Sequence, residues 1–234
     1  MKAFVVDLDS SENQIMLKPI ARSFNNQAHQ VNEAAEKIHE LIKNAPYSND
    51  NIVLKRNEIK EAFFSPFKPQ LKNAQVFLSH SHADKNKALE VKDYLESQTK
   101  RKVFIDSLFW DYKDDVLNKL AKHDDISKIE DAFTLILRES LECMIKKCPY
   151  FVFLQSKNSV SLNQDLLKIT YSAWIYEELK IANTLIADTT IKESHIKAMR
   201  ISYDITNLLG RFKPISLDSL CKKIAFNLIT KDAK

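Results

Sequence analysis

Glycine is almost absent from this sequence. The 234 residues include a single glycine, Gly210, whereas an average chain has about 7% glycine. A Walker A phosphate loop and a dinucleotide-binding fingerprint each require at least two glycines close together. Both are therefore excluded, and any nucleotide site in this chain must be built without a glycine loop.

Long apolar runs are also missing. No run approaches the roughly 20 apolar residues that a membrane-spanning helix needs. The apolar run at the N-terminus ends at Asp7, whereas a signal peptide has an apolar region of about 7–15 residues. We therefore expect a cytoplasmic protein without a membrane partner.

Cysteine, histidine and charge patterns give no support for disulfides, metals or nucleic acid. Cys143, Cys148 and Cys221 form no C-x-x-C pair. Only His80 and His82 lie close together, with no further ligand at metal-binding spacing. The 35 Lys and Arg residues face 31 Asp and Glu residues, and both signs are mixed along the chain, unlike a nucleic-acid-binding stripe. We expect reduced thiols, no metal and no nucleic-acid partner.

The first 72 residues have the pattern of a helical region. Apolar residues recur at the spacing of an amphipathic helix over 31–42, and Pro46 follows soon after. A second helix is expected near 55–64. We predict a helical N-terminal extension over residues 1–72, which either packs on the main domain or serves regulation or assembly.

From residue 73 onward, strand and helix patterns alternate. Short apolar runs rich in β-branched and aromatic residues occur at 76–78, 103–105 and 151–154. Runs of this kind are typical of strands buried on both faces of a parallel sheet. Helical patterns lie between them, so we predict an α/β domain over 73–234 with an open parallel sheet and right-handed crossovers.

Polar residues follow the predicted strands, where ligands of open parallel sheets bind. The clusters are Ser79-His80-Ser81-His82, Asp106-Ser107 and Gln155-Ser156. Because the carboxyl ends of parallel strands share one edge, we place the site there. The structural alternative for Ser81, Asp84 and Asp106 is a role as turn or cap residues.

A carboxylate occupies the apolar face of the helix predicted from residue 172. With Trp174 at zero, Glu178 falls at about 40° and Ala182 at about 80°. Glu177 falls at about 300°, on the polar side. Burying an unpaired carboxylate costs several kcal/mol, so we expect Glu178 to line a cavity beside Trp174, where burial tends to raise the pKa of a carboxyl group. The alternative is a solvated Glu178 at the rim.

Four motifs in succession resemble those of Toll/interleukin-1 receptor (TIR) domains. Residues 75–84 resemble the family's first strand and loop, residues 103–107 its second strand, and residues 150–156 its third strand. Trp174, followed four residues later by Glu178, resembles its tryptophan-glutamate helix. The resemblance covers residues 74–185 and is to the stand-alone bacterial type.

The resemblance implies a flavodoxin-like sheet and, for many bacterial members, cleavage of the nicotinamide–ribose bond of NAD+. The expected activity is that of an NAD+ glycohydrolase or ADP-ribosyl cyclase, with NAD+ as substrate and no cofactor. The expected product is ADP-ribose or a cyclic ADP-ribose. The family also implies anti-phage immune signalling, self-association through TIR–TIR contacts, and an upstream or downstream defence protein as partner.

The resemblance also implies roles for particular residues. Glu178 corresponds to the family's catalytic glutamate. The expected substrate-binding residues are Ser79, His80, Ser81, Asp106, Ser107, Trp110 and Trp174. Phe109-Trp110-Asp111-Tyr112 would begin the mobile loop after the second strand, although it lacks the glycine and proline common there. Both tryptophans also suit a core position.

Other segments depart from the family pattern. Residues 113–148 are longer than usual and mostly helical, and the connection over 156–171 is also long. The best candidate for a fourth strand is 197–203, and an amphipathic helix is expected over 217–229.

Two other functions fit the same residues. A non-catalytic TIR scaffold would act by self-assembly and protein–protein contacts, with Glu178 at a solvated rim. A nucleoside deoxyribosyltransferase-like enzyme would share the sheet and a catalytic glutamate.

Overall fold

The computed structural model describes residues 1–17, 25–45, 47–48, 51–52, 54–64, 73–105, 107–122, 125–162, 166–186 and 202–229. Within these ranges, the side chains at 25–31, 47–48, 51–52, 107–111, 128, 131–132 and 227–229 are not described. The chain divides into two compact units. Unit 1 contains Met1–Ile20, Ala74–Asp106 and Leu141–Lys234, and unit 2 contains Ala21–Asn73 and Ser107–Ser140.

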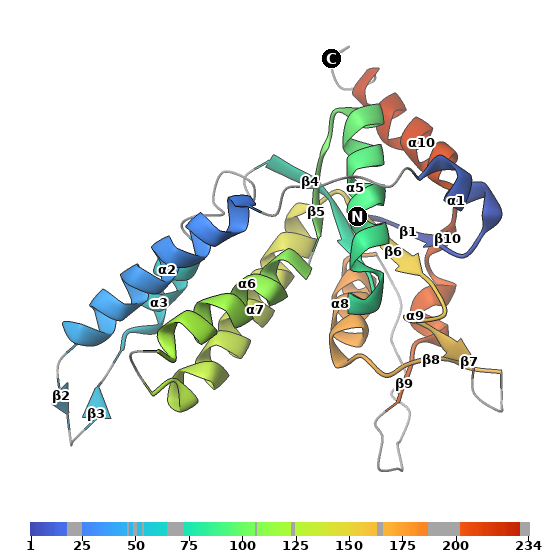
Figure 1. Cartoon of the computed structure of the whole chain (residues 1–234). Coiled ribbons are helices and arrows are strands. Elements are labelled where there is room, and N and C mark those ends of the chain that lie inside the picture. Colours follow the sequence, from blue (N-terminus) through green and yellow to red (C-terminus); the bar gives the residue numbers. More distant parts are fainter. Residues whose placement is uncertain are drawn as a thin grey trace. The chain divides into compact units, whose positions relative to one another are not determined.

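Unit 1 is built on a five-stranded sheet in which every pairing is parallel. Its strand order is β10-β1-β6-β4-β5 (Figure 1). The strands are β1 (Lys2–Asp7), β4 (Ala74–Ser79), β5 (Lys102–Ile105), β6 (Tyr150–Gln155) and β10 (Lys213–Pro214). The predicted strands at 76–78, 103–105 and 151–154 are confirmed as β4, β5 and β6, and their apolar side chains are buried.

The N-terminal strand β1 explains why the sheet has no obvious fourth strand late in the chain. In a flavodoxin-like sheet the strand order is 2-1-3-4-5. Here β5, β4 and β6 take the places of 2, 1 and 3, and β1 pairs with the free side of β6 from Lys2↔Tyr150 to Asp7↔Gln155. The predicted fourth strand over 197–203 lies largely outside the described residues, and Tyr203 belongs to a separate antiparallel sheet.

Helices cover both faces of this sheet, which makes unit 1 an α/β structure compatible with a flavodoxin-like fold. The helices are α1 (Ser11–Met16), the 3-10 turn η2 (His82–Asp84), α5 (Lys85–Thr99), α8 (Ala173–Leu185), α9 (Thr206–Gly210) and α10 (Leu217–Ile229). Helix α10 packs against α1 and α5. A small antiparallel sheet contains β7 (Ser161–Leu162), β8 (Lys168–Thr170) and β9 (Tyr203–Asp204). Strands β7 and β8 precede α8 in the chain, and β9 follows it.

The described residues of unit 2 are mostly helical, with one antiparallel pair of two-residue strands. Its elements are α2 (Asn25–Lys43), β2 (Tyr47–Ser48), β3 (Asn51–Ile52), α3 (Arg56–Phe64), α6 (Ser107–Leu120) and most of α7 (Ser127–Lys147). Phe63 is fully buried, and its ring centroid lies 4.8 Å from that of Tyr112 and 5.0 Å from that of Phe133. The Tyr112 hydroxyl donates a 2.8 Å hydrogen bond to the Phe63 carbonyl, so one aromatic cluster joins α3, α6 and α7.

The two units do not follow the predicted domain boundary between residues 72 and 73. Residues 1–72 contribute β1 and α1 to unit 1 and α2 and α3 to unit 2. Phe4 and Val6 explain the difference, because both are buried in the parallel sheet as part of β1. The start of the chain is therefore a strand of unit 1 and does not belong to a helical extension. The segment expected to begin a loop at Phe109 is the first turn of α6 instead, because Tyr112, Val116 and Leu120 form one buried helical stripe.

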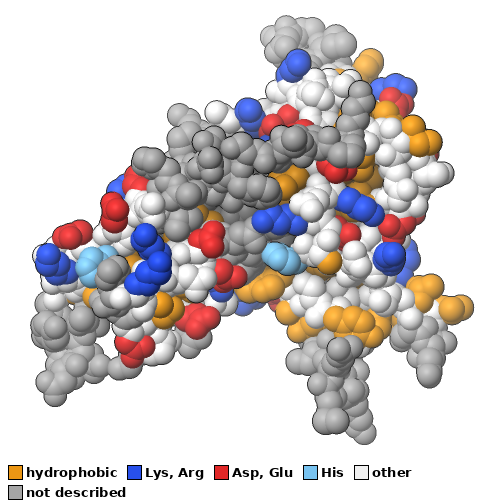
Figure 2. All heavy atoms as spheres, in the orientation of Figure 1, with side chains coloured by type: hydrophobic (Ala, Val, Ile, Leu, Met, Phe, Trp, Pro, Cys, Tyr) orange, Lys and Arg blue, Asp and Glu red, His pale blue; other side chains and the backbone are white. Residues whose placement is uncertain are grey.

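Charged side chains of both signs are interspersed on the face shown in Figure 2. This pattern agrees with the mixed charges of the sequence. Among the helices that the structure describes, none is both long enough and apolar enough to cross a bilayer.

Candidate functional site

The sheet of unit 1 changes winding direction between β4 and β6. From β4 the chain runs through α5 to β5 on one side, whereas from β6 it runs through α8 and α9 to β10 on the other. Right-handed crossovers therefore place α5 and α8 on opposite faces. Ligands of such sheets bind where the two connections diverge, which here is outside the carboxyl ends of β4 and β6.

A buried carboxylate joins the two loops that leave this switch point. Asp84 accepts a hydrogen bond from the Ser156 hydroxyl and a 2.8 Å hydrogen bond from Asn158 Nδ2. The Ser156 hydroxyl in turn accepts a 3.0 Å hydrogen bond from the Asn158 backbone N–H. Asp84 and Ser156 are both buried. The sequence prediction that the β4 and β6 clusters share one edge is thus confirmed for these two loops.

Asp84 occupies the N-cap position of α5, but its side chain makes no capping hydrogen bond. Its carboxylate instead accepts hydrogen bonds from the loop after β6. Asn158 is a further residue of this contact that the sequence motifs do not single out. The available signal was the polar turn Ser156-Lys157-Asn158-Ser159 directly after a buried strand.

Among the predicted residues at the end of β4, Ser79 and His80 are buried and Ser81 is half-buried. Ser79 is fully buried, and its hydroxyl makes no hydrogen bond within the described part of the chain. His80 is 3% exposed, and both of its ring nitrogens are buried. Ser81 is half-buried and accepts a hydrogen bond from the Asp84 backbone N–H through its carbonyl, at 2.8 Å.

Helix α8 carries the candidate catalytic carboxylate. The helix begins after Ser172, whose side chain accepts a 3.3 Å hydrogen bond from the Ile175 N–H and so caps it. Glu178 is 0% exposed and both of its carboxylate oxygens are buried, whereas Glu177 and Trp174 are half-buried. The helical-face prediction for Glu178 is confirmed. The alternative of a solvated rim position is wrong, because Glu178 lies on the inner face of α8 with Ile175.

The direction of α8 places Glu178 in the half of the helix that is nearer the carboxyl edge of the sheet. The Leu185 carbonyl at the end of α8 lies 3.5 Å from the amino group of Met1, which precedes β1 at the amino edge. Glu178 lies seven residues earlier, about 10 Å away at 1.5 Å per residue. The N-terminal turns of α8 therefore lead toward the edge at which β4 and β6 end.

The C-terminal half of α8 is held by polar contacts from the following segment. Asn183 Nδ2 donates to the carbonyls of Leu179 and Leu208, at 2.9 and 3.1 Å. Arg211 donates to the carbonyls of Asn183 and Ile186, at 3.1 and 2.6 Å. The bond from Asn183 to Leu208 and the bonds from Arg211 to Asn183 and Ile186 join α8 to the α9 segment and help to position the helix that carries Glu178.

The remaining predicted site residues are less fully described. Asp106 lies outside the described residues. Ser107 and Trp110 lie in the first turn of α6, in unit 2, and their side chains are outside the described set. The structure therefore describes Ser79, His80, Ser81, Trp174 and Glu178 in unit 1 and the backbone of Ser107 and Trp110 in unit 2.

Among the described residues, no group of three or more His, Cys, Asp or Glu side chains is arranged to hold a metal ion. No protein-family model, curated protein or solved structure matches the chain. Function must therefore be inferred from the residues and their geometry.

Proposed function

We propose that this chain is a TIR-like NAD+ nucleosidase in which Glu178 is the catalytic carboxylate. The observation that carries this proposal is the complete burial of Glu178 on the inner face of α8, one turn after Trp174. Acidic side chains are seldom fully buried, and a titratable group buried inside a ligand-binding fold is a candidate for a functional role.

The chemistry suits a single positioned carboxylate. Nicotinamide leaves NAD+ as a neutral molecule, so little acid catalysis is needed for its departure. The ribosyl group then develops positive charge, as in glycoside hydrolysis. Glu178 would stabilise that charge and hold the ribose hydroxyls. Attack by water gives ADP-ribose, and attack from within the nucleotide gives a cyclic ADP-ribose.

The other proposed roles follow the TIR resemblance. His80 and Ser81 follow strand β4 at the switch point, where they would approach the nucleotide, and Trp174 would form a wall beside Glu178. Ser79, Asp106, Ser107 and Trp110 complete the proposed substrate-binding set. We propose a cytoplasmic enzyme of bacterial anti-phage signalling that self-associates through TIR–TIR contacts and acts with another defence protein.

One observation also favours a second candidate. Glu178 has no exposed surface, so substrate can reach it only after α8 or a neighbouring loop moves. A TIR scaffold that acts by assembly alone would not need that movement.

The experiment that separates the two candidates is an NAD+ turnover assay on concentrated protein with a crowding agent. Nicotinamide, ADP-ribose and cyclic ADP-ribose are quantified by chromatography, beside measurements of assembly by light scattering. The enzyme proposal predicts nicotinamide release in equal amounts with a ribosyl product. Assembly with intact NAD+ at every protein concentration would favour the scaffold and overturn the enzyme proposal.

A further inference from the structure

Unit 1 contains a cleft whose lining does not include Glu178. The cleft has a volume of about 490 Å³ and opens where β1, β6 and β10 end. The helix after β1 packs on the α5 face, because the Tyr94 hydroxyl of α5 lies 3.8 Å from the Met16 sulfur of α1. The helix after β6 is on the opposite face, so the ends of β1 and β6 also diverge into a crevice suited to a ligand.

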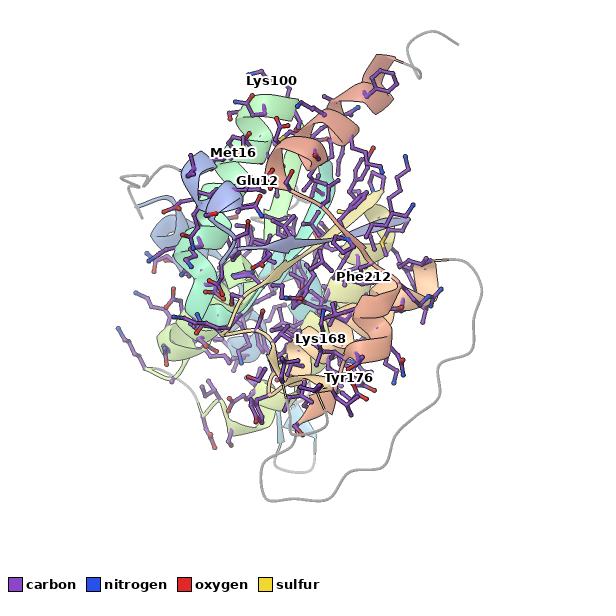
Figure 3. The ribbon with its side chains drawn as sticks, turned by 90° about the vertical axis from the view of Figure 1, so that its right-hand side faces the viewer. Glu12, Met16, Lys100, Lys168, Tyr176 and Phe212 are labelled. Atoms are coloured by element: carbon purple, nitrogen blue, oxygen red, sulfur yellow. The ribbon has the colours of Figure 1, made fainter. Side chains whose placement is uncertain are left out.

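Opposite charges line this cleft without pairing to one another. Lys168 from β8, Asp7 from β1 and Glu12 from α1 all contribute to its walls. Within the part of the chain that the structure describes, none of the three makes an ion pair. Glu12 and Lys168 lie well apart in Figure 3. One Asp7 carboxylate oxygen accepts a 2.9 Å hydrogen bond from the Asp9 N–H.

The rest of the lining is partly apolar and partly neutral. Val5, Leu209 and Ile215 form an apolar wall. Gln155 ends β6 and lines the cleft, and its side chain makes no hydrogen bond with a described residue. The cleft thus offers three kinds of surface: an apolar wall, two carboxylates that accept hydrogen bonds, and one ammonium group. Its volume lies in the range of small-molecule sites.

We propose that this cleft binds a nucleoside monophosphate. Lys168 contacts the phosphate, the Asp7 and Glu12 carboxylates accept hydrogen bonds from the ribose hydroxyls, and the base lies against the apolar wall. The two carboxylates disfavour a ligand that carries only negative charge, so hydroxyl donors are required beside the phosphate. This inference is independent of NAD+ cleavage at Glu178.

The test measures binding of AMP and UMP to the full-length protein by isothermal titration calorimetry. Adenosine, ribose 5-phosphate and inorganic phosphate are the matched probes, because each lacks one or more parts of the nucleotide. Lys168→Gln removes the ammonium group, and Lys168→Arg retains a cation. Lys157→Gln is the control on an exposed lysine of the neighbouring turn, and Glu178→Gln is the control for the candidate catalytic site.

We expect at least one nucleotide to bind, and Lys168→Gln to weaken binding by about 10- to 100-fold, the effect of losing a charge-assisted hydrogen bond. Lys168→Arg, Lys157→Gln and Glu178→Gln should bind within about threefold of wild type, too small a change for the loss of such a bond. Binding of neither nucleotide, equal binding of adenosine or inorganic phosphate, or unchanged binding by folded Lys168→Gln would each overturn the proposal. Loss of binding in Glu178→Gln but not in Lys168→Gln would place the nucleotide at the Glu178 site and would also overturn the proposal.

Discussion

Asp84→Ala should destabilise unit 1 by removing the contact between the two loops at the switch point. The Ser156 hydroxyl donates to the Asp84 carboxylate, and both residues are buried. A hydrogen bond to a charged group contributes about 1.5–3 kcal/mol, and a buried partner left without its acceptor costs a similar amount. Asn158 is exposed, so water replaces its bond to Asp84 at little cost.

We therefore expect the free energy of unfolding to fall by about 2–3 kcal/mol in Asp84→Ala. Hydrogen exchange of peptides that cover β4 and β6 measures this loss in unit 1. Ser156→Ala should cost about 1–2 kcal/mol, and the double variant should cost less than the sum, with a coupling of about 1 kcal/mol.

Asp218→Ala is the matched control, because Asp218 forms an exposed ion pair with Lys222 on α10. Exposed pairs contribute at most about 1 kcal/mol. The assigned Asp84–Ser156 contact would be contradicted if Asp84→Ala lowered the free energy of unfolding no more than Asp218→Ala does. Strictly additive losses of free energy in the double variant would contradict it as well.

Two further predictions concern packing and thiols. Phe63→Ala should lower the stability of unit 2 by about 3–5 kcal/mol, because Phe63 is fully buried between the rings of Tyr112 and Phe133; limited proteolysis should then cleave unit 2 faster, and an unchanged cleavage rate would contradict this packing. Burial raises the pKa of the Cys148 thiol to about 12 and that of Cys221 to about 11, whereas Cys143 is exposed. Because the thiolate is the reactive form, a thiol reagent at pH 8 should modify Cys143 first and the other two only on unfolding. Rapid modification of two or three thiols in the native protein, counted by mass spectrometry, would contradict the burial of Cys148 and Cys221.

The central strands of unit 1 can be predicted from sequence because each is a short apolar run bounded by polar residues. The same signal is present in β1, where Ala3, Phe4, Val5 and Val6 are followed by Asp7. Its place in the sheet is not local information, because β1 pairs with β6, almost 150 residues later. Strand β10 is harder still, since Lys213 and Pro214 are both exposed and leave no apolar pattern.

The candidate site was only partly predictable for a related reason. The face of Glu178 follows from the 3.6-residue period of a helix alone, and its burial confirms that argument. The role of Asp84 does not follow from local sequence, because an Asp before a helix suits a cap equally well. Its bond to Ser156 spans 72 residues and depends on which strands are neighbours in the sheet.

The division into two units also depends on contacts between residues that are far apart in the sequence. Helices α2 and α3 were predictable from their periodicity, but their packing with α6 joins segments on either side of β4 and β5. The residues near Phe109 lack the turn-forming glycine of a loop, and the stripe ending at Leu120 favours the helix observed there.

The most direct measurement of the central claim compares nicotinamide release by Glu178→Gln and Glu177→Gln under conditions in which the wild type releases nicotinamide. The two variants remove the same charge from adjacent residues of α8, one buried and one half-buried. If Glu178 is the catalytic carboxylate, Glu178→Gln should lose about a thousandfold in rate, as expected when a transition-state charge partner is removed. Glu177→Gln should then stay within about threefold of wild type, too small a change for a group that contributes to transition-state stabilisation. Equal rates in the two folded variants would contradict the assignment of Glu178 as the catalytic carboxylate.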